Sequence, residues 1–258
     1  MKTHQVSEND NIVLIPKSKG QRICFTVSDR TQKIPGLGVY NPGKLIGEPY
    51  GSCVTLGKNN YWLLPANTVD HLETLTRKAQ IILHKDSAMI GFYCDIKPGS
   101  RVVEGGVGSG ALTIVLLTLV GPTGKVTTYE MRSDFAKVGK NNITKAGLAG
   151  SWTLRMKDIT KGISEKDLDS VILDIPEPWL AVDTAYNALR SGGTLACYVP
   201  TMNQVERLVK KLRAGSFIDI RTIETLQREL VVGAGGTRPA FDMLGHTGYT
   251  TMGRKVLW

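Results

Sequence analysis

Residues 100–113 read SRVVEGGVGSGALT, and this stretch predicts the fold of the chain. A β-branched run ends at Glu104, four of the next six residues are glycine, and an apolar segment follows from Ala111. This order is typical of a strand, a tight turn and a helix. Glycine lets the backbone come close to a ligand, and the free N–H groups of a helix N-terminus suit an anion or a nucleotide. The stretch therefore predicts a ligand site at a strand-to-helix turn.

The sequence that follows keeps alternating between strand and helix patterns. We expect strands at residues 125–130, 151–158, 169–176, 194–200, 217–226 and 246–258, and helices at 110–120, near 133–147 and 178–190, and from 203 to 215. A glycine-rich connection, residues 230–243, separates the last two strands. The alternation predicts a largely parallel, doubly wound α/β sheet with ligands at the carboxyl ends of its strands. Two final strands without a helix between them predict an antiparallel edge.

The chain upstream of residue 65 has a different pattern. Short alternating segments broken by turn residues, such as NIVLIP at 11–16 and YWLLP at 61–65, predict a small β-rich unit. A polar, helix-compatible segment at 65–79 connects this unit to the rest. We therefore expect a β-rich N-terminal domain over residues 1–75 and a catalytic domain over residues 76–258.

Composition narrows the partner and the compartment. The formal charge of the 258-residue chain is +9, and excess Lys and Arg favour a polyanion such as nucleic acid without proving it. The most apolar run, residues 111–121, is too short to cross a bilayer, and the N-terminus has no apolar signal core, so we expect a cytoplasmic protein without a membrane partner. The four cysteines are scattered and no His stands at zinc-ligand spacing, which predicts no disulfide framework and no metal site.

Three carboxylates at successive strand ends indicate which ligand the glycine turn would bind. Glu130 ends the second strand, where it could accept hydrogen bonds from a ribose, and Asp158 ends the third, where an adenine amino group needs an acceptor. Both fit NAD and S-adenosylmethionine equally. Glu104 would face a phosphate of NAD but suits the sulfonium and ammonium of S-adenosylmethionine. The pattern therefore favours S-adenosylmethionine, while the glycine turn alone also matches a dinucleotide fingerprint.

Asp174 stands at the carboxyl end of the fourth strand, in the segment LDIPEP. Pro176 and Pro178 stiffen the loop that follows, because proline has a fixed φ and lacks an N–H. A stiff loop holds a neighbouring side chain in place. We expect Asp174 to be a positioned hydrogen-bond acceptor facing the ligand crevice.

The segments EGGVGSGALT, TYE, LDIPEP, YVPTMNQ and HTGY together resemble the tRNA adenine-58 N1 methyltransferase family, especially its archaeal members. The resemblance extends over nearly the whole chain. It implies a small N-terminal β domain and a Rossmann-like class I S-adenosylmethionine-dependent methyltransferase domain. It also implies a homotetramer that methylates N1 of adenine 58 in the T loop of tRNA, and in archaea often adenine 57 as well.

The resemblance assigns roles to particular residues. The cofactor loop would comprise Glu104, Gly106, Val107, Gly108, Ser109 and Gly110. Glu130 would hold the cofactor ribose and Asp158 its adenine. Asp174 would face the cofactor and act on the target base. Tyr198 would shape the target pocket and contribute to catalysis, with Gln204 close behind it.

Two further substrate contacts are hypotheses. The family commonly has Tyr or His, then Pro, Lys and Asp before the first catalytic helix, whereas this chain has Leu83, His84, Lys85 and Asp86. His84 could replace the missing aromatic as a lid over the base. Arg238, in the glycine-rich connection, could contact an RNA phosphate.

Three other functions stay open at this point. A corrin-ring or isoaspartyl methyltransferase shares the glycine loop, and an NAD-dependent oxidoreductase shares the dinucleotide pattern. A tRNA-binding scaffold without catalysis is the third, although the chain keeps Asp174 and every cofactor carboxylate.

Overall fold

A four-stranded antiparallel sheet forms the N-terminal part of the computed structural model, which describes residues 4–78, 80–233 and 235–257. Its strands lie in the order β2-β1-β6-β5. Their bounds are Asn11–Pro16 for β1, Ile23–Thr26 for β2, Cys53–Leu56 for β5 and Asn59–Pro65 for β6. A two-stranded ladder, β3 (Gln32–Ile34) with β4 (Gly38–Tyr40), and a 3-10 turn at Pro42–Leu45 complete this unit. Its own core includes Ile12, Leu14 and Leu63, all fully buried.

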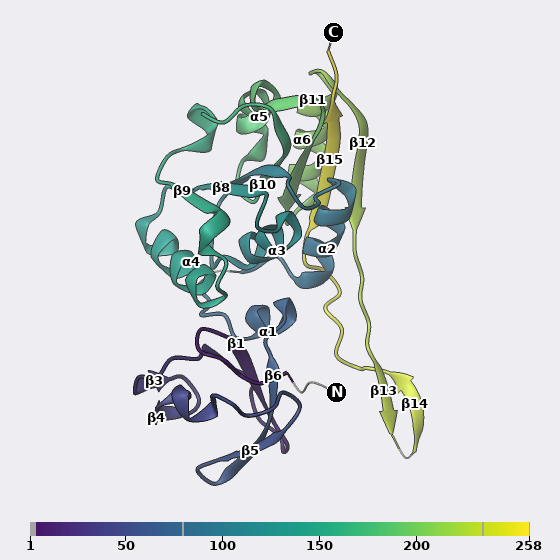
Figure 1. Cartoon of the computed structure of the whole chain (residues 1–258). Helices are drawn as coiled ribbons and strands as arrows, with labels where there is room; N and C mark the ends of the chain where they lie inside the picture. The colour runs from purple at the N-terminus through teal and green to yellow at the C-terminus, as the bar shows by residue number, and fades with distance from the viewer. Residues whose placement is uncertain (1–3, 79, 234, 258) are drawn as a thin grey trace.

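Two helices connect this unit to the second sheet (Figure 1). Helix α1 covers only Thr68–Glu73, because Asn67 begins it with a capping box to Asp70 and Thr74 ends it. Helix α2, His84–Tyr93, was not predicted from the sequence. Its first turn buries Asp86 and Ser87 instead of apolar residues, so the segment lacks the usual amphipathic pattern.

The second sheet has seven strands in the order β12-β15-β11-β10-β7-β8-β9. The strands are β7 (Arg101–Gly105), β8 (Lys125–Tyr129), β9 (Trp152–Arg155), β10 (Leu168–Leu173), β11 (Leu189–Val199), β12 (Phe217–Glu224) and β15 (Tyr249–Lys255). The five from β9 to β11 are parallel, as the alternating pattern predicts. The antiparallel strand is β15, which pairs with both β11 and β12. The sequence pattern indicated an antiparallel strand at the edge of the sheet, whereas β15 is the second strand from that edge and β12 forms the edge itself.

Helices cover both faces of this sheet, which confirms the doubly wound α/β fold. They are α3 (Ala111–Val120), α4 (Ser133–Lys145), α5 (Val182–Ala188) and α6 (Met202–Arg213), with 3-10 turns at Ala149–Ser151, Ile159–Lys161 and Pro178–Ala181. Side chains alternate between the two cores with the period of a strand: Val102 and Ile172 pack with α3, whereas Val103 and Leu173 pack on the side of α5 and α6.

Two segments differ from the sequence expectation. The helix expected near 178–190 is shorter, because β11 begins at Leu189 and takes in the SGG residues that were expected to end the helix. The glycine-rich connection forms a hairpin of β13 (Leu230–Gly233) and β14 (Gly236–Pro239). Figure 1 shows this hairpin standing away from the seven-stranded sheet at the end of a long extension of β12. None of the helices in the described ranges has the length and apolar character needed to cross a membrane.

Candidate functional site

The glycine loop lies between β7 and α3, at the carboxyl edge of the parallel strands. Gly106, Gly108 and Gly110 have φ angles of +89°, +48° and +83°, a region that other residues adopt at a cost. A Cβ atom on Gly106 would collide with the carbonyl oxygen of Asp174, and one on Gly110 would lie 3.3 Å from the backbone of Gly139. Around Gly108 the space is open. The two ends of the loop therefore pack against the end of β10 and against α4, whereas its middle, at Gly108, has free space beside it.

Glu104 is buried directly before this loop. Its Oε2 accepts hydrogen bonds from the hydroxyls of Thr113, at 2.7 Å, and Thr128, at 2.6 Å. Its Oε1 has no hydrogen-bond partner among the described residues. Burial, with a smaller contribution from the neighbouring Asp174 and Glu130, raises the pKa of this carboxyl to about 8. The unpartnered oxygen calls for a hydrogen-bond donor or a cation from a ligand.

Glu130 follows β8 and braces the loop from the other side. Its two carboxylate oxygens accept the backbone N–H groups of Val107, at 3.1 Å, and Arg132, at 2.8 Å. A carboxylate has about four acceptor positions, so two such bonds leave room for ribose hydroxyls. The residue is only 8% exposed, so Glu130 is buried beside the loop.

Asp158 follows β9 and caps the 3-10 turn at Ile159–Lys161. Its Oδ1 accepts from both the hydroxyl and the backbone N–H of Thr160, at 2.7 and 2.9 Å. The hydrogen bonds from Thr160 lower the pKa of Asp158, so it is ionised at neutral pH. Its other oxygen has no hydrogen bond to the described residues and is available to a ligand.

Asn142 also supports the loop, and no sequence pattern indicated it. This buried residue of α4 donates from its Nδ2 to the carbonyl of Ser109, at 2.8 Å, and to the carbonyl of Thr76, at 2.9 Å. The backbone N–H of Lys78 donates to the Ser109 hydroxyl at 3.1 Å. A polar residue inside a helix is ordinarily exposed, so only the fold reveals that Asn142 joins the glycine loop to the connection between the two sheets.

Asp174 lies beside the glycine loop, just past the end of β10. Its backbone N–H donates to the carbonyl of Gly105 at 2.9 Å. The residue is exposed to solvent, but protein atoms crowd around its carboxyl group, and the resulting loss of solvation raises the pKa of Asp174 to about 6. Gln204, in the first turn of α6, donates to the carbonyl of Pro176 at 3.1 Å and so holds the proline-containing loop.

Tyr198, near the end of β11, belongs to a buried polar cluster that the sequence did not predict. Lys85 and Asp86 form an ion pair at 2.8 Å, with side chains 8% and 2% exposed. The Thr247 hydroxyl donates to Asp86 at 2.9 Å, and the Tyr198 hydroxyl makes a longer contact of 3.4 Å with the same carboxylate oxygen. Burial raises the pKa of Tyr198 to about 12, and its ring packs directly against Gly248.

The remaining two candidate residues lie apart from these contacts. His84 is the first residue of α2, and its side chain is exposed beside the buried Lys85. Arg238 lies on β14 of the projecting hairpin, where its guanidinium stacks over the ring of Phe241 at 4.0 Å. The fold therefore gathers the glycine loop, Glu104, Glu130 and Asp174 at the carboxyl ends of adjacent strands, and it does not bring Arg238 to them. In the described parts of the chain, no three His, Cys, Asp or Glu side chains are grouped as a metal site.

Comparison with known proteins identifies the family. The family model described as "tRNA methyltransferase complex GCD14 subunit" matches residues 62–237, a range that includes the glycine loop, Asp174 and Tyr198. The chain belongs to the GCD14 tRNA methyltransferase family. Membership confirms the resemblance drawn from the sequence motifs.

Individual relatives of this GCD14 family chain agree with that result. It is 36% identical to the tRNA (adenine(57)-N(1)/adenine(58)-N(1))-methyltransferase TrmI of Methanocaldococcus jannaschii, with 76% of this chain and 79% of the relative covered. An S-adenosylmethionine-dependent O-methyltransferase of Thermotoga maritima has a similar structure, with a TM-score of 0.85, 32% identity and coverage of 98% and 96% of the two chains. The tRNA (m1A58) methyltransferase TrmI of Aquifex aeolicus shares the fold, with a TM-score of 0.79, 24% identity and coverage of 99% and 100%. The methyltransferase fold with an N-terminal β unit is thereby confirmed.

Proposed function

We propose that this enzyme transfers a methyl group from S-adenosylmethionine to N1 of adenine 58 in tRNA. The observation that carries the proposal is the position of Asp174, which is exposed to solvent and whose backbone N–H is hydrogen-bonded to Gly105, directly before the glycine loop. An acceptor at this place can reach a base that is brought to the loop. The archaeal relative named for adenines 57 and 58 supports the same target.

The residues around the loop fit the cofactor. The unpartnered Oε1 of Glu104 suits a cationic ligand, and the open space at Gly108 leaves room for one. We propose that Glu104, Gly106, Val107, Gly108, Ser109 and Gly110 hold the cofactor, with Glu130 at its ribose and Asp158 at its adenine. S-adenosylmethionine, when bound, supplies an activated methyl group on a sulfonium. Because this cofactor has no phosphate, a buried carboxylate is tolerated directly before the loop.

The chemistry requires a carboxylate on the base side. Adenine N1 is a weak nucleophile, and its methylation leaves a positive charge on the ring. Asp174 is proposed to accept a hydrogen bond from the exocyclic N6 amine, which stabilises that charge as it develops. Because its pKa is about 6, the side chain is mainly ionised at pH 7 and able to accept. Gln204 is proposed to position the Asp174 loop through the carbonyl of Pro176.

Tyr198 and His84 are proposed to shape the base pocket. Adenine in a folded tRNA is stacked, so it must be extruded into a pocket lined by apolar or aromatic groups. The Tyr198 ring packs against Gly248 and its hydroxyl contacts Asp86, a position that suits a wall of such a pocket. His84 is exposed on the adjoining helix and is proposed as a lid. For Arg238, we propose a phosphate contact on a tRNA bound to another subunit, since the hairpin stands away from the seven-stranded sheet of its own chain.

The test is to map the methylated nucleoside. Protein, labelled S-adenosylmethionine and unmodified tRNA are incubated, and the RNA is digested and analysed by mass spectrometry. We expect label in 1-methyladenosine, located at nucleotide 58 by reverse transcription. A transcript with guanine in place of adenine 58 serves as the control, and it also reveals any methylation of adenine 57. Label in a 2′-O-methyl nucleoside, or no label, would show the assignment to be wrong.

We propose further that the enzyme is a homotetramer in the cytoplasm, where tRNA is its substrate. The projecting hairpin and the segment that follows it support assembly, because large exposed apolar side chains are typical of a protein contact surface. The exposed side chains are Leu230 at 65%, Val232 at 78%, Phe241 at 81% and Leu244 at 61%. The division into domains at residues 75 and 76 is also a proposal. It is consistent with a separate core for each sheet.

Placing charges on the hairpin and on the segment after it should break the assembly. For wild-type protein, light scattering is expected to give four times the chain mass of 28.1 kDa. The double variant Val232→Asp, Phe241→Asp should give a smaller species with unchanged far-UV circular dichroism, because burying two carboxylates in an apolar contact is unfavourable. Val39→Asp, at an equally exposed apolar residue of the N-terminal unit, is the control. A monomeric wild type, or a tetrameric double variant, contradicts the proposal.

A further inference from the structure

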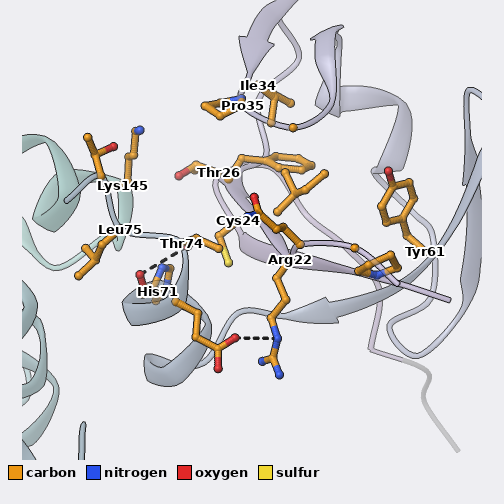
Figure 2. Close-up of a pocket in the computed structure, with 18 of the residues that line it drawn as sticks. Arg22, Cys24, Thr26, Ile34, Pro35, Tyr61, His71, Thr74, Leu75 and Lys145 are labelled. Carbon is orange, nitrogen blue, oxygen red and sulfur yellow. Dashed lines mark hydrogen bonds and ion pairs between the residues drawn. The ribbon is translucent and has the colours of Figure 1, made fainter. Parts of the chain in front are cut away.

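A large cavity lies between the N-terminal sheet and helices α1 and α4 (Figure 2). Its volume is about 1100 Å³, which is at or above the upper end for small-ligand pockets. Residues of β2, β3, the β1–β2 connection, α1 and the last turn of α4 line it. Figure 2 shows Lys145 of α4 across the cavity from Ile34 and Pro35. A cavity of this size between two units is suited to a segment of a polymer.

The charge of the cavity is positive. Lys19, Lys33 and Lys145 line it from three separate segments, and all three side chains are exposed. None of them forms an ion pair with a carboxylate in the described ranges, whereas Arg22 is paired with Asp70 and, at 3.0 Å, with Glu73. Three unpaired cations spread around one opening do not converge on a single anion. They suit a ligand with several separated negative charges.

The residues that line the cavity are better suited to the backbone of a nucleic acid than to its bases. The two aromatic residues in the wall, Phe25 and Tyr61, are 8% and 5% exposed, so neither offers a free ring face for stacking. The other lining groups include amides and hydroxyls, for example those of Gln21, Gln32 and Thr26, which bond sugar and phosphate oxygens. The chemistry favours a sugar–phosphate backbone.

The cavity adjoins the support of the cofactor loop. Asn142 lines the cavity and donates to the carbonyl of Ser109 in that loop. Lys137 and Lys140, exposed on α4 ahead of Lys145, extend the positive surface along the helix that packs against the loop. An RNA bound in the cavity would therefore continue along α4 toward the catalytic domain.

We propose that this cavity, the lysine groove, binds the sugar–phosphate backbone of the tRNA substrate at a point separate from the target adenine. The inference rests on the proposed function, because it assumes that the polyanion is tRNA. The groove would increase the affinity for tRNA and fix the position of the tRNA on the enzyme. It would make no contact with the reacting atoms. Its lysines should act on the KM for tRNA and leave kcat unchanged.

The test is the triple variant Lys19→Gln, Lys33→Gln, Lys145→Gln, compared with wild type in tRNA binding by fluorescence anisotropy over a series of salt concentrations. Each lost phosphate contact lowers the slope of log K against log salt by about 0.7 to 0.9. We expect the slope to fall by about 2 and the Kd at low salt to rise at least about 10-fold. The KM for tRNA should rise in parallel, with kcat and the Kd for S-adenosylmethionine within about 2-fold.

The control is Lys44→Gln, Lys97→Gln, Lys166→Gln, which removes the same charge from exposed sites outside the groove. If wild type methylates tRNA and the groove variant binds it like this control, the groove inference is wrong while the proposed function stands. If the groove variant loses tRNA affinity but wild type forms no 1-methyladenosine, the function is wrong and the groove inference holds. A change in oligomeric state with unchanged tRNA affinity would identify the groove as a subunit contact and overturn the inference.

Discussion

Replacing Asp174 with asparagine is expected to lower kcat for tRNA methylation by about 100- to 1000-fold. Asparagine keeps the size of the side chain and one acceptor oxygen but loses the negative charge that faces the methylated, cationic base. The charge develops only in the transition state, so kcat falls more than the affinity for either substrate. The Kd for S-adenosylmethionine, measured by calorimetry, should change by about 2-fold or less. Single-turnover methylation assays on the same samples measure the loss of rate.

The pH profile provides a second measurement on the same variant. Crowding by protein removes solvation from the Asp174 carboxyl and raises its pKa to about 6, so protonation below that pH removes the acceptor. In wild type the single-turnover rate should therefore fall as the pH is lowered through about 6, and this acid limb should be absent from Asp174→Asn. Asp183→Asn, at an exposed carboxylate of α5, is the matched control and should keep both the rate and the limb. Full activity of Asp174→Asn would exclude Asp174 from the chemistry.

Replacing Glu104 with glutamine is expected to raise the Kd for S-adenosylmethionine by about 100-fold, because a charge-assisted hydrogen bond in a buried site contributes about 1.5 to 3 kcal/mol. The free Oε1 of Glu104 has no partner among the described residues, so the carboxylate is left for a cation. Glutamine has nearly the same shape but carries no charge. Calorimetric titration with S-adenosylmethionine measures the change, and Glu206→Gln on the exposed face of α6 is the control.

Glu104→Gln should weaken cofactor binding, but at pH 8 it should not lower the stability of the cofactor-free protein. The pKa of Glu104 is raised from an ordinary 4.5 to about 8 in the fold. Its contribution to stability is therefore fully present below about pH 4.5 and is lost as the pH rises through about 8, since ionisation is then favoured in the unfolded chain. Thermal unfolding should show wild type losing stability between these pH values, with a flatter profile for Glu104→Gln.

The variant should consequently be at least as stable as wild type at pH 8 while binding the cofactor poorly. A variant that is destabilised equally at all pH values would indicate that Glu104 only fills space and bonds Thr113 and Thr128. An unchanged Kd for S-adenosylmethionine would remove Glu104 from the cofactor site. Either outcome would indicate that the Glu104 carboxyl has a structural role and does not bind the cation of the cofactor.

Features that depend on local pattern could be predicted from the amino-acid sequence. Alternating strand and helix patterns predicted the doubly wound sheet, and the glycines at 106, 108 and 110 predicted the tight turn. Both predictions were possible because the period of apolar residues and the local backbone conformation depend on short segments of sequence. The carboxylates Glu104, Glu130 and Asp174 could be placed at one edge, since the carboxyl ends of parallel strands meet there. Helix α2 was missed because its buried face carries Asp86 and Ser87.

Contacts between distant segments, in contrast, emerged only from the folded chain. The contacts of Asp86 with Tyr198 and Thr247 join residues more than a hundred positions apart, and Asn142 reaches Ser109 from another helix. The lysine groove exists only where the N-terminal sheet faces helices α1 and α4, and the glycine-rich connection became a projecting hairpin through its own strand pairing. Such contacts depend on how whole elements pack and on the entropy of closing long loops, and neither quantity is encoded in any short stretch of sequence.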